Sequence, residues 1–155
     1  MNTLDIDILI TEVGMRDGLQ AVKRTMATPD KKRWVDALVA AGLREIEVAS
    51  FVPPKLLPQM ADATEITQYA ASFRGISIIG LVPNFKGAQA AIAAGVHKLT
   101  IPCSASVAHS LANVRKTREQ MVDEVRNIVA LRNEVAPQVK IEAGISVAFG
   151  CTLQG

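Results

Sequence analysis

The segment of this sequence with the clearest chemical character places a cation, a carboxylate and a glycine side by side, as Arg16, Asp17 and Gly18. It follows an apolar run, residues 6–13, that we predict to be a strand. In parallel α/β folds the active site lies beyond the C-terminal ends of the strands. The segment therefore stands where catalytic residues are expected in such a fold.

Each of the two charged side chains suits a definite role. Asp17 offers a hard oxygen ligand for Mg²⁺ or Mn²⁺. Arg16 could stabilise negative charge on a carbonyl oxygen. The alternative is an exposed ion pair in a tight turn at Gly18 that has no chemical role. The residue pattern alone leaves both interpretations open.

Three further polar residues are candidates for the same site: Glu47, Gln20 and Ser50. Glu47 falls inside or at the mouth of the second predicted strand, where a lone carboxylate would be costly unless it were paired. Pairing with Arg16 is the simplest resolution, and it fits a structural salt bridge as well as a catalytic role. Gln20 and Ser50 could hydrogen-bond a substrate or bond locally within turns.

Five apolar runs are predicted to be strands, at residues 6–13, 44–50, 76–83, 97–103 and 139–149. Several are apolar at successive positions, which is typical of parallel strands covered on both faces.

Four segments between these runs have the start and stop signals of helices. We predict N-caps for them at Thr28, Asp62, Asn84 and Thr117, with capping boxes from Asp62 to Glu65 and from Thr117 to Gln120. We expect Gly42, Gly95 and Pro137 to end three of these helices.

The resulting βα alternation indicates an α/β fold with a parallel sheet and right-handed crossovers. Alternation alone does not separate a doubly wound sheet from a (β/α)8 TIM barrel. A complete barrel needs roughly 250 residues. On the barrel interpretation, the 155 residues hold about four βα units plus a fifth strand.

Composition limits the classes of partner. Hydrophobic residues make up 49% of the chain and the net charge is +2, which suits one globular domain and does not suggest a nucleic-acid binder. No run approaches the length of a membrane helix. Cys103 and Cys151 form no CxxC pair, so we expect a reduced, cytoplasmic setting and a packing role for Cys103.

Several segments resemble the 3-hydroxy-3-methylglutaryl-CoA lyases, a family of metal-dependent TIM-barrel lyases. The resemblance begins with Glu12–Gly14 and Arg16–Gln20 and is strong in Ile46–Lys55 and Pro58–Asp62. It continues through shorter runs to the end of the chain, at Val82–Asn84, Lys86–Gly87, Ser104–Ser106 and Phe149–Cys151. It covers nearly the whole chain in order.

The resemblance implies that residues 1–155 form the N-terminal half of a barrel domain. It implies retro-Claisen cleavage of an acyl-CoA thioester, 3-hydroxy-3-methylglutaryl-CoA, to acetyl-CoA and acetoacetate, with Mg²⁺ or Mn²⁺ as cofactor. Arg16 would then stabilise the enolate oxygen, and Asp17 would be one metal ligand. We also expect a homo-oligomer.

Parts of the family pattern are not matched. The family's other metal ligands include a His-x-His pair on a later strand, and neither His97 nor His109 fits it. We expect His97 at a strand edge and His109 in the loop before the last helix. Thr152 and Gln154 stand where the family often has proline and glutamate. A related barrel aldolase or Claisen-type synthase, or a non-catalytic half-barrel, therefore stays open as an alternative.

Overall fold

Parallel strands form the framework of the computed structural model, which describes residues 8–155. Within this range one five-stranded sheet is built from β1 (Thr11–Glu12), β2 (Glu45–Ser50), β3 (Ser77–Leu81), β4 (Lys98–Ser104) and β5 (Lys140–Ser146). All neighbours pair in parallel, and the strand order in the sheet is the order in the chain. This is the order expected of successive βα units in a barrel wall.

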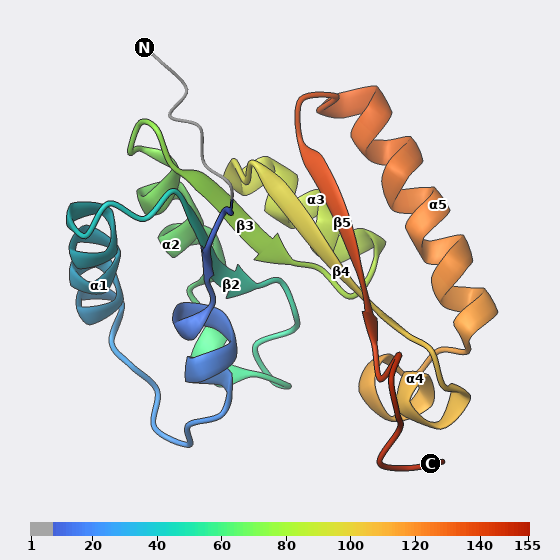
Figure 1. The fold of residues 1–155 in the computed structure, drawn as a ribbon. Coiled ribbons are helices and arrows are strands. Elements are labelled where there is room, and N and C mark those ends of the chain that lie inside the picture. The colour runs from blue at the N-terminus through green and yellow to red at the C-terminus, as the bar shows by residue number, and fades with distance from the viewer. Residues whose placement is uncertain (1–7) are drawn as a thin grey trace.

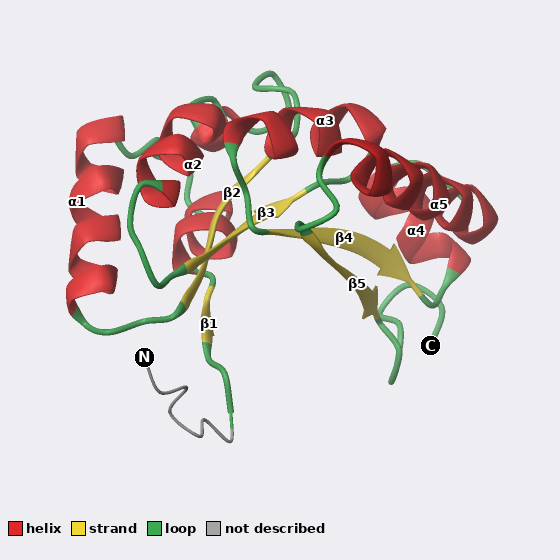
Figure 2. Ribbon diagram, turned by 90° about the horizontal axis from the view of Figure 1, so that it is seen from above, coloured by secondary structure: helices red, strands yellow, loops and turns green. Residues whose placement is uncertain are grey.

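Five α-helices connect and cover these strands: α1 (Thr28–Ala40), α2 (Ala63–Ala71), α3 (Phe85–Ala94), α4 (Val107–Val114) and α5 (Arg118–Val135). Two short helical turns, η1 (Gly14–Gly18) and η2 (Pro58–Met60), follow β1 and precede α2. Figure 2 shows the helices along the convex side of a curved sheet, with the concave side open. The described chain is thus an arc of a TIM barrel.

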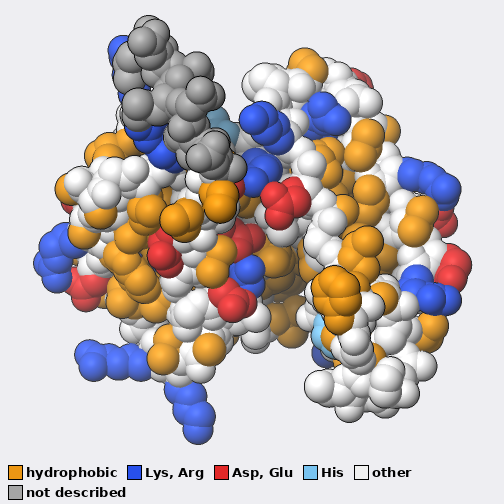
Figure 3. Space-filling model, viewed as in Figure 1, with side chains coloured by type: hydrophobic (Ala, Val, Ile, Leu, Met, Phe, Trp, Pro, Cys, Tyr) orange, Lys and Arg blue, Asp and Glu red, His pale blue; other side chains and the backbone are white. Residues whose placement is uncertain are grey.

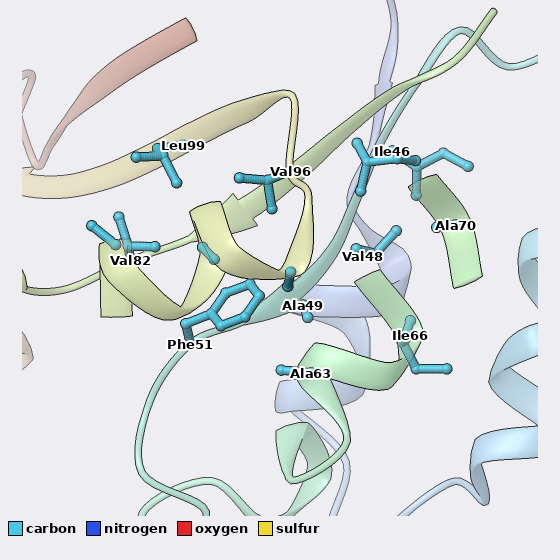
Figure 4. Close-up of a cluster of buried hydrophobic side chains, with 14 of the residues drawn as sticks. Ile46, Val48, Ala49, Phe51, Ala63, Ile66, Ala70, Val82, Val96 and Leu99 are labelled. Carbon is cyan, nitrogen blue, oxygen red and sulfur yellow. The ribbon is translucent and has the colours of Figure 1, made fainter. Parts of the chain in front are cut away.

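The main core lies between the sheet and its helices. All six residues of β2 are buried, and Ile46 and Val48 pack near Ile66 and Ala70 of α2 (Figure 4). Leu99 continues this layer on β4. Burying each large aliphatic side chain contributes about 1.5–3 kcal/mol, so the sheet and helices depend on one shared core.

The outer strands are shorter than the sequence predicts. Of the predicted strand at residues 6–13, only Thr11–Glu12 pairs with β2, residues 8–10 are exposed coil, and residues 6–7 lie outside the described residues. The predicted strand 139–149 ends at Ser146, because Val147 adopts a left-handed backbone conformation (φ 54°) that interrupts extension. The predictions for the three inner strands are confirmed within a few residues.

Two of the four predicted N-caps are confirmed with their hydrogen bonds. The Asn84 side chain accepts from the Gly87 amide, and Thr117 forms a capping box with Gln120. Asp62 is the N-cap residue of α2, as predicted, but its side chain makes no capping hydrogen bond, so the predicted capping box with Glu65 is not formed. The predicted cap at Thr28 is wrong, because Ala27 is the N-cap residue and Thr28 is already helical. The side chains of Thr28 and Asp62 are instead paired with each other, across the α1–α2 contact.

One helix, α4, is absent from the sequence-based prediction. It has only eight residues, and Ser106 caps it by accepting from the His109 amide. His109 therefore lies in a helix, and its predicted place in a loop is wrong. Within residues 8–155, each helix is too short or too polar to cross a membrane.

Candidate active site

The polar candidates gather at the C-terminal ends of the strands. Figure 1 shows η1, which carries Arg16 and Asp17, at the same lower end of the sheet as α4. Ser50 is the last residue of β2, and Ser104 and Ser146 are the last residues of β4 and β5. Parallel pairing brings all these ends to one edge, as the sequence predicts for a barrel site.

Arg16 is held in place by two carboxylates. Its Nε and Nη2 atoms lie 2.8 and 2.7 Å from Oε2 of Glu47, and Nη1 lies 2.6 Å from Oδ1 of Asp17. Glu47 is nearly inaccessible at 4% side-chain exposure, whereas Asp17 is 62% exposed. The predicted Arg16–Glu47 pair is thus present, and it holds the guanidinium from inside while Asp17 faces the open end.

Glu47 is an unusual partner because its second oxygen, Oε1, is buried without a hydrogen bond among the described residues. Burial raises the pKa of Glu47 above its ordinary value, and the attraction of Arg16 offsets only part of this effect. The nearby carboxylates of Asp17 and Glu142 raise the pKa further. Such a carboxylate, perturbed at the end of a strand, is typical of functional sites.

Glu45, two positions earlier on the same face of β2, shows the opposite behaviour. Burial raises the pKa of Glu45, but hydrogen bonds from Lys98 and Thr11 outweigh it, and the net shift is downward. The Lys98 Nζ atom lies 2.8 Å from Oε1 of Glu45 and 3.0 Å from Oε2 of Glu142. These ion pairs lie at the N-terminal end of the sheet. In barrels, residues at this end are expected to serve stability rather than chemistry.

A cavity of about 620 Å³ opens beside Arg16 at the C-terminal end. This size is typical of small-molecule sites, and Figure 3 shows the hollow between the two halves of the open face. Among the predicted residues Arg16, Asp17, Gln20 and Ser50 line it, whereas Glu47 lies behind Arg16. The Ser50 hydroxyl, in the wall of this cavity, is buried and has no hydrogen-bond partner among the described residues.

The same cavity is bordered by residues that the sequence-based reasoning did not select. They come from β4, α4 and β5, and they are Thr100, His109, Asn113 and Ser146. The signal that could have found two of them is the spacing of Val107, Leu111 and Val114, which marks one face of α4. The other histidine, His97, accepts from the Ile78 amide before β4 begins, close to its predicted strand-edge position.

Side chains that could ligate a metal do not cluster in the part of the chain that the structure describes. Within residues 8–155, no group of three or more His, Cys, Asp or Glu side chains could hold a metal ion. Asp17 fits as a single ligand, since it is exposed at the cavity and only its Oδ1 atom bonds Arg16.

The two cysteines have different surroundings. Cys103 is half-buried against the core, which confirms its predicted packing role, and burial raises the pKa of its thiol. Cys151 is buried, with Sγ 3.0 Å from the Ser106 hydroxyl, and this hydrogen bond lowers the pKa of Cys151. Cys151 thereby ties the segment after β5 to the start of α4.

The sequence and the fold agree with one group of known proteins. The family model described as HMGL-like matches residues 7–154. The mitochondrial hydroxymethylglutaryl-CoA lyase of Homo sapiens is 38% identical over 155 residues, which cover 100% of this chain and 47% of that protein. A 3-hydroxy-3-isohexenylglutaryl-CoA/hydroxymethylglutaryl-CoA lyase of Pseudomonas aeruginosa is 38% identical over 148 residues, 96% of this chain and 49% of that one.

Solved structures give the same result. The hydroxymethylglutaryl-CoA lyase of Pseudomonas aeruginosa superposes with a TM-score of 0.88 at 36% identity, over 96% of this chain and 49% of that one. An HMG-CoA lyase of Acinetobacter baumannii, solved with coenzyme A and 3-methylmalate, also gives 0.88, at 33% identity over 95% and 47%. The chain spans about half the length of the curated relatives it matches. With its family model, its barrel-type fold and its paired Arg16 and Glu47 in agreement, this chain belongs to the HMGL-like family.

Proposed function

We propose that this protein takes part in the cleavage of 3-hydroxy-3-methylglutaryl-CoA to acetyl-CoA and acetoacetate. The observation that carries the proposal is the Arg16 guanidinium, held by buried Glu47 and facing a cavity of suitable size beside Asp17. The named activity of the relatives supports it.

The reaction needs a fixed cation at the thioester. A base removes the proton of the 3-hydroxyl, the C2–C3 bond breaks as the C3 carbonyl forms, and the electron pair passes to C2 as a thioester enolate. Protonation of C2 then gives acetyl-CoA. Arg16 has five N–H donors, and its contacts to Glu47 and Asp17 occupy three. Two donors remain to stabilise the enolate oxygen, and losing such stabilisation typically costs about 3 kcal/mol or more of barrier.

Glu47 acts here as a positioning residue. Its Oε2 atom lies 2.8 Å from Nε and 2.7 Å from Nη2 of Arg16. These two contacts fix the plane of the guanidinium before substrate binds. This fixed plane lowers the entropy lost when the oxyanion is bound. Gln20 and Ser50 line the same cavity and are proposed to hydrogen-bond the substrate.

We propose Mg²⁺ or Mn²⁺ as the cofactor, with Asp17 as one oxygen ligand. Metal dependence is general in this family. When bound, the ion would hold and acidify the 3-hydroxyl group of the substrate. The contribution of Arg16 derived above does not depend on which ion is present.

The name of one relative suggests a second candidate substrate, 3-hydroxy-3-isohexenylglutaryl-CoA. The Pseudomonas aeruginosa lyase named for 3-hydroxy-3-isohexenylglutaryl-CoA is as similar to this chain as the human enzyme, at 38% identity. The cavity has apolar side chains from Val52, Leu56 and Leu57 beside its polar ones, which could accept a longer branch at C3.

Equilibrium binding tests the proposal on the chain itself. Calorimetry should show binding of 3-hydroxy-3-methylglutaryl-CoA in Mg²⁺, weakened at least about tenfold by Arg16→Gln. Arg33→Gln, which removes an exposed arginine paired with Asp30 on α1, is the matched control and should bind normally. Equal affinity in both variants would contradict the proposed role of the cavity.

A further inference from the structure

His109 occupies a defined place at the edge of the candidate site. It lies in the first turn of α4, directly after β4, and its backbone amide donates to the capping hydroxyl of Ser106. The end of a barrel strand and the helix that follows it are where site residues are expected. The position of this ring is therefore set by regular structure on both sides.

The imidazole is held through one nitrogen only. Its Nδ1 atom lies 2.8 Å from Oγ of Ser104, a residue that is itself buried at 7% exposure. Among residues 8–155, the ring's other nitrogen, Nε2, makes no hydrogen bond. A histidine oriented through one nitrogen presents the other to a ligand.

The ring borders the same cavity as Arg16 and Asp17, but from another part of the sheet. Arg16 and Asp17 come from η1 beside β1 and β2, whereas His109 comes from α4 beside β4. Asn113, four residues further along α4, also borders the cavity, so one face of the helix is turned toward it. A ligand that begins at Arg16 and extends across the cavity would meet this face.

We propose that His109 binds an oxygen of the substrate's acyl group, either the 3-hydroxyl or the terminal carboxylate. The inference rests on the proposed function and extends it with a recognition residue on the β4 side of the cavity. Because Arg16 acts on the thioester, a group at the other end of the acyl chain would lie near His109 and Asn113 of α4. His109 is thus a specificity-determining residue, and it is absent from the metal and enolate chemistry.

Nuclear magnetic resonance offers a direct test because the chain has only two histidines. The imidazole signals of His109 and His97 are recorded while 3-hydroxy-3-methylglutaryl-CoA is added with Mg²⁺. His97 precedes β4 at the opposite end of that strand and serves as an internal control. The proposal expects His109 to shift in a saturable way and His97 to stay unchanged.

Two simpler thioesters identify the group that is recognised. Glutaryl-CoA has the terminal carboxylate without the hydroxyl, and 3-hydroxybutyryl-CoA has the hydroxyl without the carboxylate. One of the two should reproduce the His109 shift. Free coenzyme A, which has neither group, should leave His109 unchanged, and a full shift with coenzyme A alone would overturn the proposal.

Variants separate recognition from packing. His109→Phe keeps a ring but removes both nitrogens, and it should weaken binding of the full substrate about tenfold or more. His109→Gln retains an amide donor near the position of Nε2 and should recover part of the affinity. His97→Asn, which keeps an acceptor for the Ile78 amide, is the control and should bind like the unchanged chain.

The outcomes distinguish this inference from the proposed function. If substrate shifts the Arg16 and Ser50 amide signals while His109 stays unchanged, or if His109→Phe binds normally, the inference is wrong and the proposed function stands. If the substrate shifts neither Arg16 nor His109 at saturating concentration, both are wrong.

Discussion

At the scale of single residues, β2 carries two glutamates whose surroundings differ sharply. At one end of the sheet, the Glu45 carboxylate forms an ion pair with Lys98 and accepts a hydrogen bond from the Thr11 hydroxyl. Glu47 has one oxygen bonded to Arg16 and the other buried without a partner in the described chain. Burying an unsatisfied charged oxygen costs free energy, so Glu47 is kept at the expense of stability. Buried carboxylates with perturbed pKa values are typical of functional sites.

The opposite pKa shifts of the two glutamates give a prediction about stability and pH. The pKa of Glu47 is raised in the folded state, so its contribution is present at low pH and is lost as pH rises past the ordinary value of about 4.3. The free energy of unfolding of the unchanged protein, minus that of Glu47→Gln, should therefore fall as pH rises. Urea unfolding between about pH 4 and 8 measures this difference.

Glu45→Gln is the matched control for that series. Because the pKa of Glu45 is lowered by folding, the corresponding difference should grow as pH rises. The same pH trend in both variants would contradict the assigned surroundings of the two carboxylates.

At the scale of elements, helix α1 is joined to α2 by a buried lysine. Lys31 Nζ lies 2.5 Å from Oδ1 of Asp62 and also donates to the Gln59 carbonyl, while the Thr28 hydroxyl donates to Oδ2 of Asp62. Lys31 is 3% exposed in its side chain. The Asp62 side chain thus fixes the position of one helix against the next instead of making a capping hydrogen bond to its own.

Removing Asp62 should uncouple these helices. Asp62→Ala leaves the Lys31 ammonium buried without its carboxylate, and such a loss typically costs about 3–5 kcal/mol. Asp30→Ala breaks the exposed Arg33–Asp30 pair on α1 and should cost no more than about 1 kcal/mol. Denaturant midpoints of the two variants test this, and similar destabilisation of both would show that Asp62 has no special role.

The sequence predicts the inner elements well and the outer ones poorly, for physical reasons. Strand β2 is buried along its whole length and β3 is buried at its centre, while β4 alternates between buried and half-buried residues. Each of these strands carries enough closely spaced apolar residues to be recognised in the sequence. The length of β1 depends on its pairing with β2, which no local pattern reveals. Helix α4 was missed because eight residues barely exceed two turns.

The candidate site divides in the same way. The segment from Arg16 to Gln20 and the pairing with Glu47 were predictable, because adjacent residues and the cost of a buried charge point to them. The place of His109 at the cavity could not be predicted from the sequence, because it depends on the position of α4 relative to β4. Contacts between elements far apart in sequence need the fold.

At the scale of the whole molecule, each of the two outer strands has one side without a strand partner in the described chain. In the described chain, β1 bonds only β2 and β5 bonds only β4. Next to the free side of β5, Ile145 is 67% exposed and Phe149 is fully exposed. Open edges with apolar side chains favour strand addition, so we expect the 155-residue chain studied alone to self-associate.

Sedimentation velocity tests that expectation, with a variant on each surface. Ile145→Lys places a charge beside the free side of β5 and should shift the chain toward monomer. Val122→Lys, at an exposed apolar position on α5, should leave association unchanged. A dispersed monomer near 16.6 kDa for the unchanged chain would contradict the expectation.

The most direct test of the central claim uses a chimera. This chain replaces the matching 49% of the Pseudomonas aeruginosa lyase, and turnover of 3-hydroxy-3-methylglutaryl-CoA is measured with Mg²⁺. We expect no measurable turnover from the 155-residue chain alone and clear acetoacetate production from the chimera. Arg16→Gln should lower kcat of the chimera by about 10³ or more, with Arg33→Gln close to unchanged. A folded chimera that forms no acetoacetate, or one whose Arg16→Gln variant keeps a normal kcat, would contradict the account.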